Sequence, residues 1–240
     1  MLWDQLKEWK ENCRWVELSH PLSPRTPHWS GFPDMADTTL FDYPDGFYVN
    51  KFELVSQYGT HVDAPAHFIE GAPTLESFAA EQLVMPLCVV DLCAKVRENQ
   101  DYAASKQDIL DWEAQYGPVP EGAFVALRTD WSKRGDLDNM DESGQKHYPG
   151  WSIECLEYLV KERKVGAIGH EPSDTDPAVL AAETGYECEV YILKAGRFQV
   201  ELLCNLDQVP PAGAVIFCGF PRAVGGAGFT ARCIAVCSKD

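Results

Sequence analysis

The alternation of apolar and polar residues along the chain predicts both strands and helices. Short, mainly apolar runs indicate strands at residues 15–20, 87–92, 123–127, 165–169, 215–218 and 233–237. Helices are expected at residues 2–13, 105–112 and 152–164, with a short helix or turn at 73–80 and a short loop before an apolar stretch at 185–194. Ser105 and Ser152 stand where N-caps are expected. Several strands are apolar on both faces, so the pattern predicts an α/β fold with a mixed, partly closed sheet.

The chain is expected to form one domain over residues 1–240, because it shows no internal repeat and no linker long enough to divide it. Trp3, Leu6 and Trp9 lie on one side of the expected N-terminal helix. An apolar stripe of this kind has to be covered, either by the body of the protein or by another subunit.

A second alternation, in residues 52–57, predicts a strand that ends near Gly59. His61 and Asp63 follow two positions apart, so in extended backbone both side chains point into the same space. Gly59 permits a positive φ or a close approach of the backbone to a ligand.

Pro65 then fixes the path of the chain, and His67 is expected to return to the same cavity. Two imidazoles and a carboxylate within seven positions, His61, Asp63 and His67, form a ligand set for a divalent metal. The alternative is a polar loop with two unrelated histidines, which the neighbouring glycine and proline disfavour.

The same stretch resembles the signature of the cyclase-type metal-dependent hydrolases, the family of kynurenine formamidase and isatin hydrolase. That signature reads His-x-Gly-Thr-His-x-Asp-x-Pro-x-His, and the matching residues are Gly59, Thr60, His61, Asp63, Pro65 and His67. The resemblance implies that His61 and Asp63 are metal ligands and that His67 is the catalytic acid/base. Gln57 stands where the family has its first histidine, and its carbonyl oxygen would be a weaker and harder ligand.

Residues 196–207 also resemble the family, and the resemblance implies that Glu201 is a further ligand, for a second metal. The family's partner histidine, twelve positions earlier, is replaced by Glu189. His170 and Glu189 are second candidates for the metal surroundings or a second ion. His170 follows a strand, where loops often build sites, although a surface-loop histidine is an equally good interpretation. In the acid-rich loop after His170, Glu171 stands where the family has an aspartate.

Aromatic residues supply candidates for a substrate pocket. Trp29 matches an aromatic position that the family places near its active site, and one of Phe47 and Tyr48 is expected to join it. Only one of these two residues is expected to line the pocket, because neighbouring side chains in a strand face opposite ways. Aromatic residues are also ordinary core residues. His20 is interpreted equally as a site residue and as a partner of the backbone.

Composition narrows the partners. A formal net charge of -17 argues against nucleic acid and anionic membranes. The first 13 residues show no secretory signal, and no apolar run has membrane-spanning length. The nine cysteines are scattered, without paired CxxC spacing, which is typical of a protein in the reducing cytoplasm.

We therefore expect a metal-dependent hydrolase that opens an amide, lactam or ester bond of a small molecule, with Mn²⁺ or Zn²⁺ as its ion. Alternatives are a lyase, dehydratase or cyclase using the same site, or a non-catalytic binding module. The resemblance further implies a swivelling β/β/α-like fold and a homodimer or homotetramer. Kynurenine formamidase activity itself is discounted, because Gln57 and Glu189 replace two histidines of that enzyme.

Overall fold

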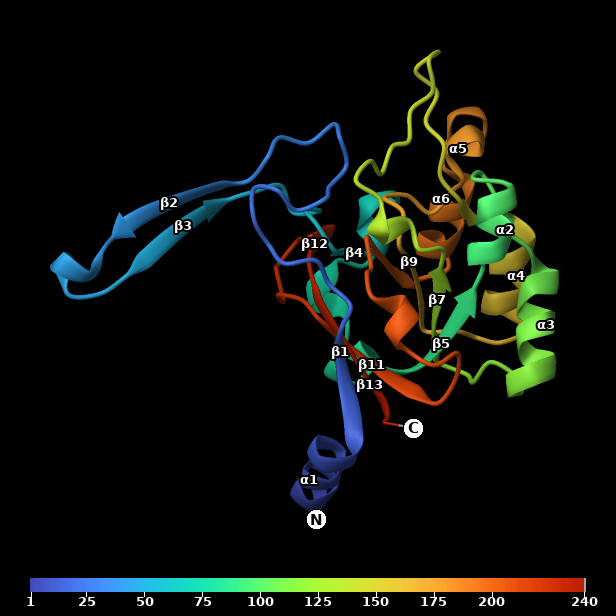
Figure 1. Ribbon diagram of the computed structural model, residues 1–240, viewed down its shortest axis with the longest axis horizontal. Coiled ribbons are helices and arrows are strands. Elements are labelled where there is room, and N and C mark those ends of the chain that lie inside the picture. The colour runs from blue at the N-terminus through green and yellow to red at the C-terminus, as the bar shows by residue number, and fades with distance from the viewer. Residues whose placement is uncertain (240) are drawn as a thin grey trace.

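One nine-stranded sheet organises the chain, and the computed structural model describes residues 1–239 (Figure 1). The strands lie in the order β1-β13-β11-β5-β7-β9-β10-β4-β12. Their bounds are β1 Cys13–Glu17, β4 His61–Asp63, β5 Val84–Asp91, β7 Phe124–Arg128, β9 Ala167–His170, β10 Phe198–Glu201, β11 Ala214–Gly219, β12 Gly228–Thr230 and β13 Arg232–Ser238. The central strands β5, β7, β9 and β10 run parallel, and the pairs outside them are antiparallel. The sheet is mixed and curls into a half-barrel, which confirms the predicted fold class.

Helices cover one face of this sheet, as Figure 1 shows for the region of β5 and β7. Their bounds are α2 Cys93–Glu98, α3 Lys106–Tyr116, α4 Ile153–Lys161, α5 Ala178–Thr184 and α6 Glu187–Lys194. In β7, Val125 and Leu127 belong to the core on the helical side, while Phe124 and Ala126 belong to the core on the other side. Burial on both faces explains why such strands are continuously apolar.

Two predicted helix starts are confirmed by their caps. The Ser105 hydroxyl accepts from the backbone N–H of Asp108, and the Asp108 carboxylate accepts from that of Ser105, which is the reciprocal capping box that begins α3. The Ser152 hydroxyl caps α4 by accepting from the backbone N–H of Cys155, but the helix ends at Lys161 rather than near residue 164. Lys164 has a φ of 51°, which a continuing helix does not allow. The apolar stretch before residue 194 is a helix, α6.

A long hairpin projects from the body of the protein (Figure 1). Its strands are β2 Ala36–Phe41 and β3 Val49–Glu53, and neither contains a buried residue. The strand predicted over residues 52–57 is therefore wrong in its bounds: the alternation is real, but β3 ends at Glu53. Residues 54–60 then turn the chain back to the sheet, where β4 begins at His61.

The N-terminal helix α1, Leu2–Asn12, forms as predicted but buries none of its residues. Trp3 is 67% exposed, while Trp9 makes an edge-on ring contact with Phe217 of β11. A short parallel pair, β6 Ala103–Ala104 and β8 Gly150–Trp151, completes the strands. The nine cysteines are free thiols. Within residues 1–239, no helix combines the length and apolar character needed to cross a bilayer.

Candidate metal centre and active site

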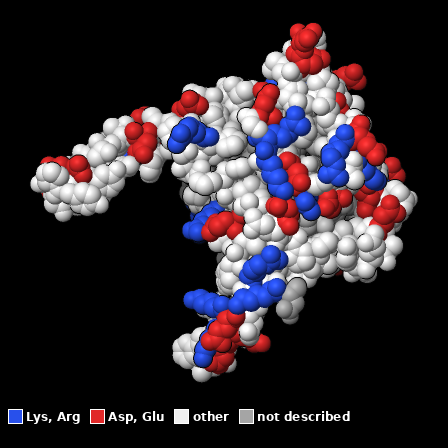
Figure 2. All heavy atoms as spheres, viewed as in Figure 1, with Lys and Arg blue, Asp and Glu red and all other residues white. Residues whose placement is uncertain are grey.

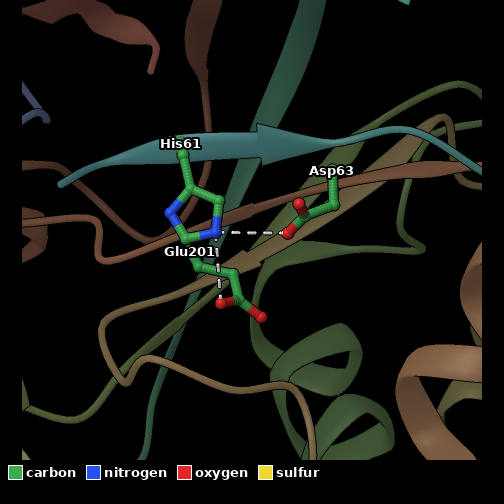
Figure 3. A group of neighbouring side chains, drawn as sticks. All are labelled: His61, Asp63 and Glu201. Atoms are coloured by element: carbon green, nitrogen blue, oxygen red, sulfur yellow. Dashed lines mark ion pairs between the residues drawn. The ribbon is translucent and has the colours of Figure 1, made fainter. Parts of the chain in front are cut away.

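The site is built on one face of the antiparallel pair β4 and β10. Glu201 lies opposite His61 in this ladder, and Gln199 lies opposite Asp63. Because side chains two positions apart share a face, the four side chains converge on one point. Figure 3 shows His61, Asp63 and Glu201 pointing toward one another beside the β4 strand.

His61 is oriented as a metal ligand. Its Nδ1 lies 2.8 Å from the carbonyl oxygen of Gly59, to which it donates, so in the neutral ring the lone pair is on Nε2. That Nε2 lies 3.3 Å from Oδ2 of Asp63 and 3.4 Å from Oε2 of Glu201 (Figure 3). Two ligand atoms of a tetrahedral ion at about 2.1 Å are about 3.4 Å apart, so the spacing fits a shared ion.

One carboxylate oxygen of Asp63 also fits a metal ligand, because it lacks a hydrogen-bond donor among residues 1–239. Its Oδ1 is buried and accepts no hydrogen bond from the described residues. Gly228 of β12 makes room for this oxygen, since a Cβ there would lie 2.8 Å from it. A glycine is therefore required at position 228 for close packing against Asp63.

The cavity concentrates negative charge. Four buried carboxylates face it or one another, those of Asp63, Asp174, Glu189 and Glu201. No lysine or arginine of residues 1–239 is within ion-pair distance of them, and their ionic partners are histidines. Buried charges have to be paired or to bind metal, so this donor set fits a divalent cation.

Charge neighbours shift the pKa values in the directions expected of such a cluster. Burial alone lowers the pKa of His61, but the charges and hydrogen bonds of Asp63 and Glu201 outweigh it and raise the pKa well above its ordinary value. Burial, reinforced by the charge of Glu201, raises the pKa values of Asp174 and Glu189 well above theirs. The site thus favours the positively charged form of His61, and it disfavours the ionised forms of Asp174 and Glu189.

His67 is brought to the cavity by a 3₁₀ turn, Pro65–His67. Its side chain is 32% exposed, and its Nε2 lies 3.9 Å from both Asp63 Oδ1 and Glu189 Oε1. The amide nitrogen of Gln57 lies 3.3 Å from its Nδ1. Because an amide nitrogen only donates, Nδ1 accepts and Nε2 carries the proton that faces the cavity.

This arrangement bears on the interpretation of Gln57. The Ser56 hydroxyl donates to the Gln57 carbonyl oxygen. The amide nitrogen serves His67. In this structure Gln57 contacts the acid/base candidate, and its role as a metal ligand stays a prediction.

Glu189 enters the cavity from the first turn of α6. The Asp176 carboxylate accepts from the backbone N–H groups of Cys188 and Glu189, at 3.0 and 3.1 Å, and so fixes the start of this helix. Glu171 is likewise structural: its carboxylate accepts from Thr129, Trp131 and Ser132. Its position in the acid-rich loop of the sequence did not distinguish a structural role from a role in metal binding.

Two residues of the site were missed in the sequence. Asp174 lies in the acid-rich loop and forms a possible metal group with Glu189 and Glu201. Gln199 is fully buried, and its amide nitrogen donates to Glu189 at 2.9 Å and to Glu201 at 3.1 Å. Thr175 holds the other end of this amide through a 2.5 Å hydrogen bond. The position of Gln199, two before Glu201 in a strand, was the available signal.

Among the remaining candidate site residues, some lie at the cavity and others lie away from it. His170 is fully buried, so the surface-loop interpretation is wrong. The backbone N–H of His20 donates to Thr60, and His20 does not line the cavity. Trp29 does line it, whereas Phe47 and Tyr48 lie at the exposed end of the projecting hairpin and not in the cavity of the same chain. The hairpin carries the two residues away from the body, which corrects their assignment to the pocket (Figure 1).

The cavity has a volume of about 250 Å³, and both aromatic and polar side chains line it. It is lined by Trp29, Phe32, Gln57, His61, His67, Phe68, Ser173, Asp174, Tyr186, Glu189 and Glu201. The aromatic members approach from three different segments.

The half-barrel and this site define a metal-dependent hydrolase, and the chain belongs to the cyclase family, whose family model, described as "Putative cyclase", matches residues 16–177. The chain is 28% identical to an isatin hydrolase of Roseibium aggregatum over 93% of its own length and 92% of that protein. Among solved structures, isatin hydrolase A from Labrenzia aggregata bound to benzyl benzoate superposes with a TM-score of 0.93, at 29% identity and full coverage of both chains. Isatin hydrolase A from Ralstonia solanacearum gives a TM-score of 0.91 at 34% identity, covering 99% of this chain and 97% of that one. The resemblance drawn from the residues around His61 is confirmed.

Proposed function

We propose that this protein hydrolyses an amide or lactam bond, or an ester, of a small aromatic molecule, with Mn²⁺ or Zn²⁺ held by His61, Asp63 and Glu201. The observation that carries this proposal is the convergence of Nε2 of His61 with the carboxylates of Asp63 and Glu201 beside a cavity lined by aromatic rings. An ion bound there supplies a Lewis acid that polarises a carbonyl group and makes water more acidic.

The side chains around the ligands supply the proton chemistry. A leaving nitrogen needs a proton, and the Nε2–H of His67 faces the cavity where that nitrogen would lie. Gln57 keeps this proton on the cavity side of the ring. Asp63 and Glu189 each place a carboxylate oxygen 3.9 Å from this Nε2.

The aromatic side of the cavity supports a flat substrate. Trp29, Phe32, Phe68 and Tyr186 present rings at its mouth. Aromatic rings favour other rings through stacked or edge-on contacts. The relatives named above are isatin hydrolases, so we place a fused aromatic lactam first among the substrates, before an N-formyl aromatic amine and an aryl ester.

The test compares metal-stripped protein with protein reloaded with Mn²⁺ or Zn²⁺, on isatin, an N-formyl aromatic amine and an aryl ester. Mass spectrometry of the products should show the gain of one water, only after reloading. A His147→Ala variant is a matched control, because His147 pairs with Asp101 and does not line the cavity. Turnover that survives metal removal would refute the proposal, and a product without added water would favour the lyase or cyclase alternative.

We also propose that the protein is a homo-oligomer. A two-stranded hairpin alone is marginally stable in water, yet β2 and β3 bury no residue. Figure 2 shows that most of the visible hairpin surface is uncharged, and Phe41, Phe47 and Phe52 are each about half exposed. Together with Trp3 on α1, these side chains support a second copy of the chain as the covering surface.

A further inference from the structure

We infer that His170 is a positioning residue that holds Glu201 in its ligating orientation, and that the indole of Trp151 prevents His170 from binding the metal itself. This inference rests on the metal site proposed above. It settles the role of a histidine that the sequence left open between a metal ligand and a neighbour of the ligands.

Strand topology places the two side chains together. β9 and β10 are parallel neighbours, with Gly169 opposite Val200. His170 and Glu201 are the next residues and the last of their strands, at the edge where parallel strands present functional groups. A backbone hydrogen bond from Leu203 to the carbonyl of His170, at 3.0 Å, fixes the two strand ends relative to each other.

Trp151 decides which ring nitrogen of His170 carries the proton. The indole Nε1 of Trp151 lies 3.2 Å from Nδ1 of His170. An indole nitrogen can only donate, so Nδ1 has to accept with its lone pair. In the neutral ring the proton is then on Nε2. A protonated nitrogen has no lone pair for a metal, so His170 is a donor where His61 is a ligand.

The proton on Nε2 of His170 faces Glu201. Nε2 makes no hydrogen bond that meets the usual geometry with the described residues, and Oε1 of Glu201, at 3.4 Å, is the carboxylate oxygen within ion-pair distance of it. The same Oε1 accepts from the amide of Gln199 at 3.1 Å. Oε1 therefore accepts from Gln199 and faces Nε2 of His170, and Oε2, which lies 3.4 Å from Nε2 of His61, is the oxygen left for the ion.

Burial restricts His170 to this role. Trp151 and His170 are both completely buried, and neither lines the cavity. His170 cannot touch a substrate or exchange protons directly with bulk water. Its effect on the reaction has to pass through Glu201, as hydrogen-bond partners of metal ligands act in known metal sites.

The first test is nitrogen-15 NMR of the histidine rings in metal-free protein and in the diamagnetic Zn²⁺ form. The shifts of His170 should show Nδ1 without a proton and Nε2 with one in both forms. The opposite tautomer would overturn the inference whatever the activity of the enzyme. Trp151→Phe should release the preference, so that both tautomers of His170 are seen.

The second test is calorimetric titration with Zn²⁺. His170→Phe, which keeps the ring size but cannot donate, should weaken binding by about 10–100-fold, and His170→Gln, whose amide can donate to Glu201, should recover part of the loss. His147→Phe is the matched control and should bind like the wild type. Thermal unfolding of the metal-free variants separates a folding defect from a binding defect.

The outcomes distinguish this inference from the proposed function. If the wild type binds Zn²⁺ and His170→Phe binds it equally well, the positioning role is wrong and the metal site stands. If the wild type binds no divalent ion, both are wrong. If His170→Phe does not fold, the tautomer in the wild type and the affinity of His170→Gln still decide the matter.

Discussion

Replacing His67 by alanine separates proton transfer from metal binding in this site. His67 Nε2 is 3.9 Å from its nearest carboxylate oxygens, whereas His61 Nε2 is 3.3 Å and 3.4 Å from its own. The shorter spacing is the one that fits a shared ion, and Gln57 leaves the proton on Nε2 of His67. His67→Ala should therefore keep the metal and lose the acid.

The expected loss of turnover in His67→Ala follows from the role of His67 as a general acid. General acid catalysis contributes about 10²–10⁴-fold, which corresponds to about 3–5 kcal/mol in the barrier. The effect on folding should be small, because the His67 side chain is 32% exposed. Its main ring contact is edge-on with Phe68, at 4.9 Å between centroids. We expect turnover to fall by the full factor while the unfolding temperature changes little.

The assay pairs metal analysis by mass spectrometry after dialysis with steady-state turnover on isatin, for His67→Ala, the wild type and the control His147→Ala. One group of possible ligands does include His67, together with Asp63 and Glu189. If the variant loses an ion that the wild type holds, His67 is a ligand and the acid assignment is refuted. If turnover falls by less than about tenfold with the metal retained, His67 is neither.

Further variants test the rest of the molecule. Asp63→Asn keeps the shape of the site but removes a full charge, so metal content should fall sharply while an equally dialysed wild type keeps its ion. Gly228→Ala should also weaken metal binding, because its Cβ would lie 2.8 Å from Asp63 Oδ1; unchanged affinity would show that the strand can yield. Light scattering should give a multiple of the 26.8 kDa chain mass, and Phe52→Ser should shift it toward the monomer; a monomeric wild type at about micromolar concentration contradicts the proposed assembly. Asp108→Asn should cost about 1–3 kcal/mol in the free energy of unfolding. Burial alone would raise the pKa of Asp108, but hydrogen bonds from Lys95 and Ser105 lower it, so the stabilisation is present above about pH 4 and lost as the pH falls further. Urea unfolding of both proteins should therefore show a constant difference from about pH 7 to 5, and a difference that grows on acidification would be contrary to this assignment.

The local part of the site was predictable from the sequence. His61 and Asp63 are two apart in extended backbone, and the turn begun at Pro65 does return His67 to the cavity. These relations depend on neighbours within seven positions. The fold class followed from the same kind of local pattern, because the central strands are buried on both faces and read as apolar runs.

The sequence-based predictions were wrong where they required knowing whether a segment packs on the body of the protein or projects from it. Residues around Phe52 alternate as in any strand, but nothing in the alternation says that the strand belongs to a projecting hairpin. Phe47 and Tyr48 were assigned to the pocket for that reason. Asp174 was missed because the acid-rich loop contains three carboxylates, and only their hydrogen-bond partners separate it from Glu171 and Asp176.

The three histidines of the site show why residue type alone does not define a role. Each presents Nε2 to a carboxylate, yet a different partner decides whether that nitrogen bears a proton. The carbonyl of Gly59 accepts from Nδ1–H of His61, so in the neutral ring the lone pair is on Nε2 and faces the proposed ion. A donor at Nδ1 has the opposite effect in His67 and His170, where Nε2 keeps its proton. Since the two donors come from an amide ten positions away and an indole nineteen positions away, the division into ligand, acid and positioning residue that we propose can arise only in the folded chain.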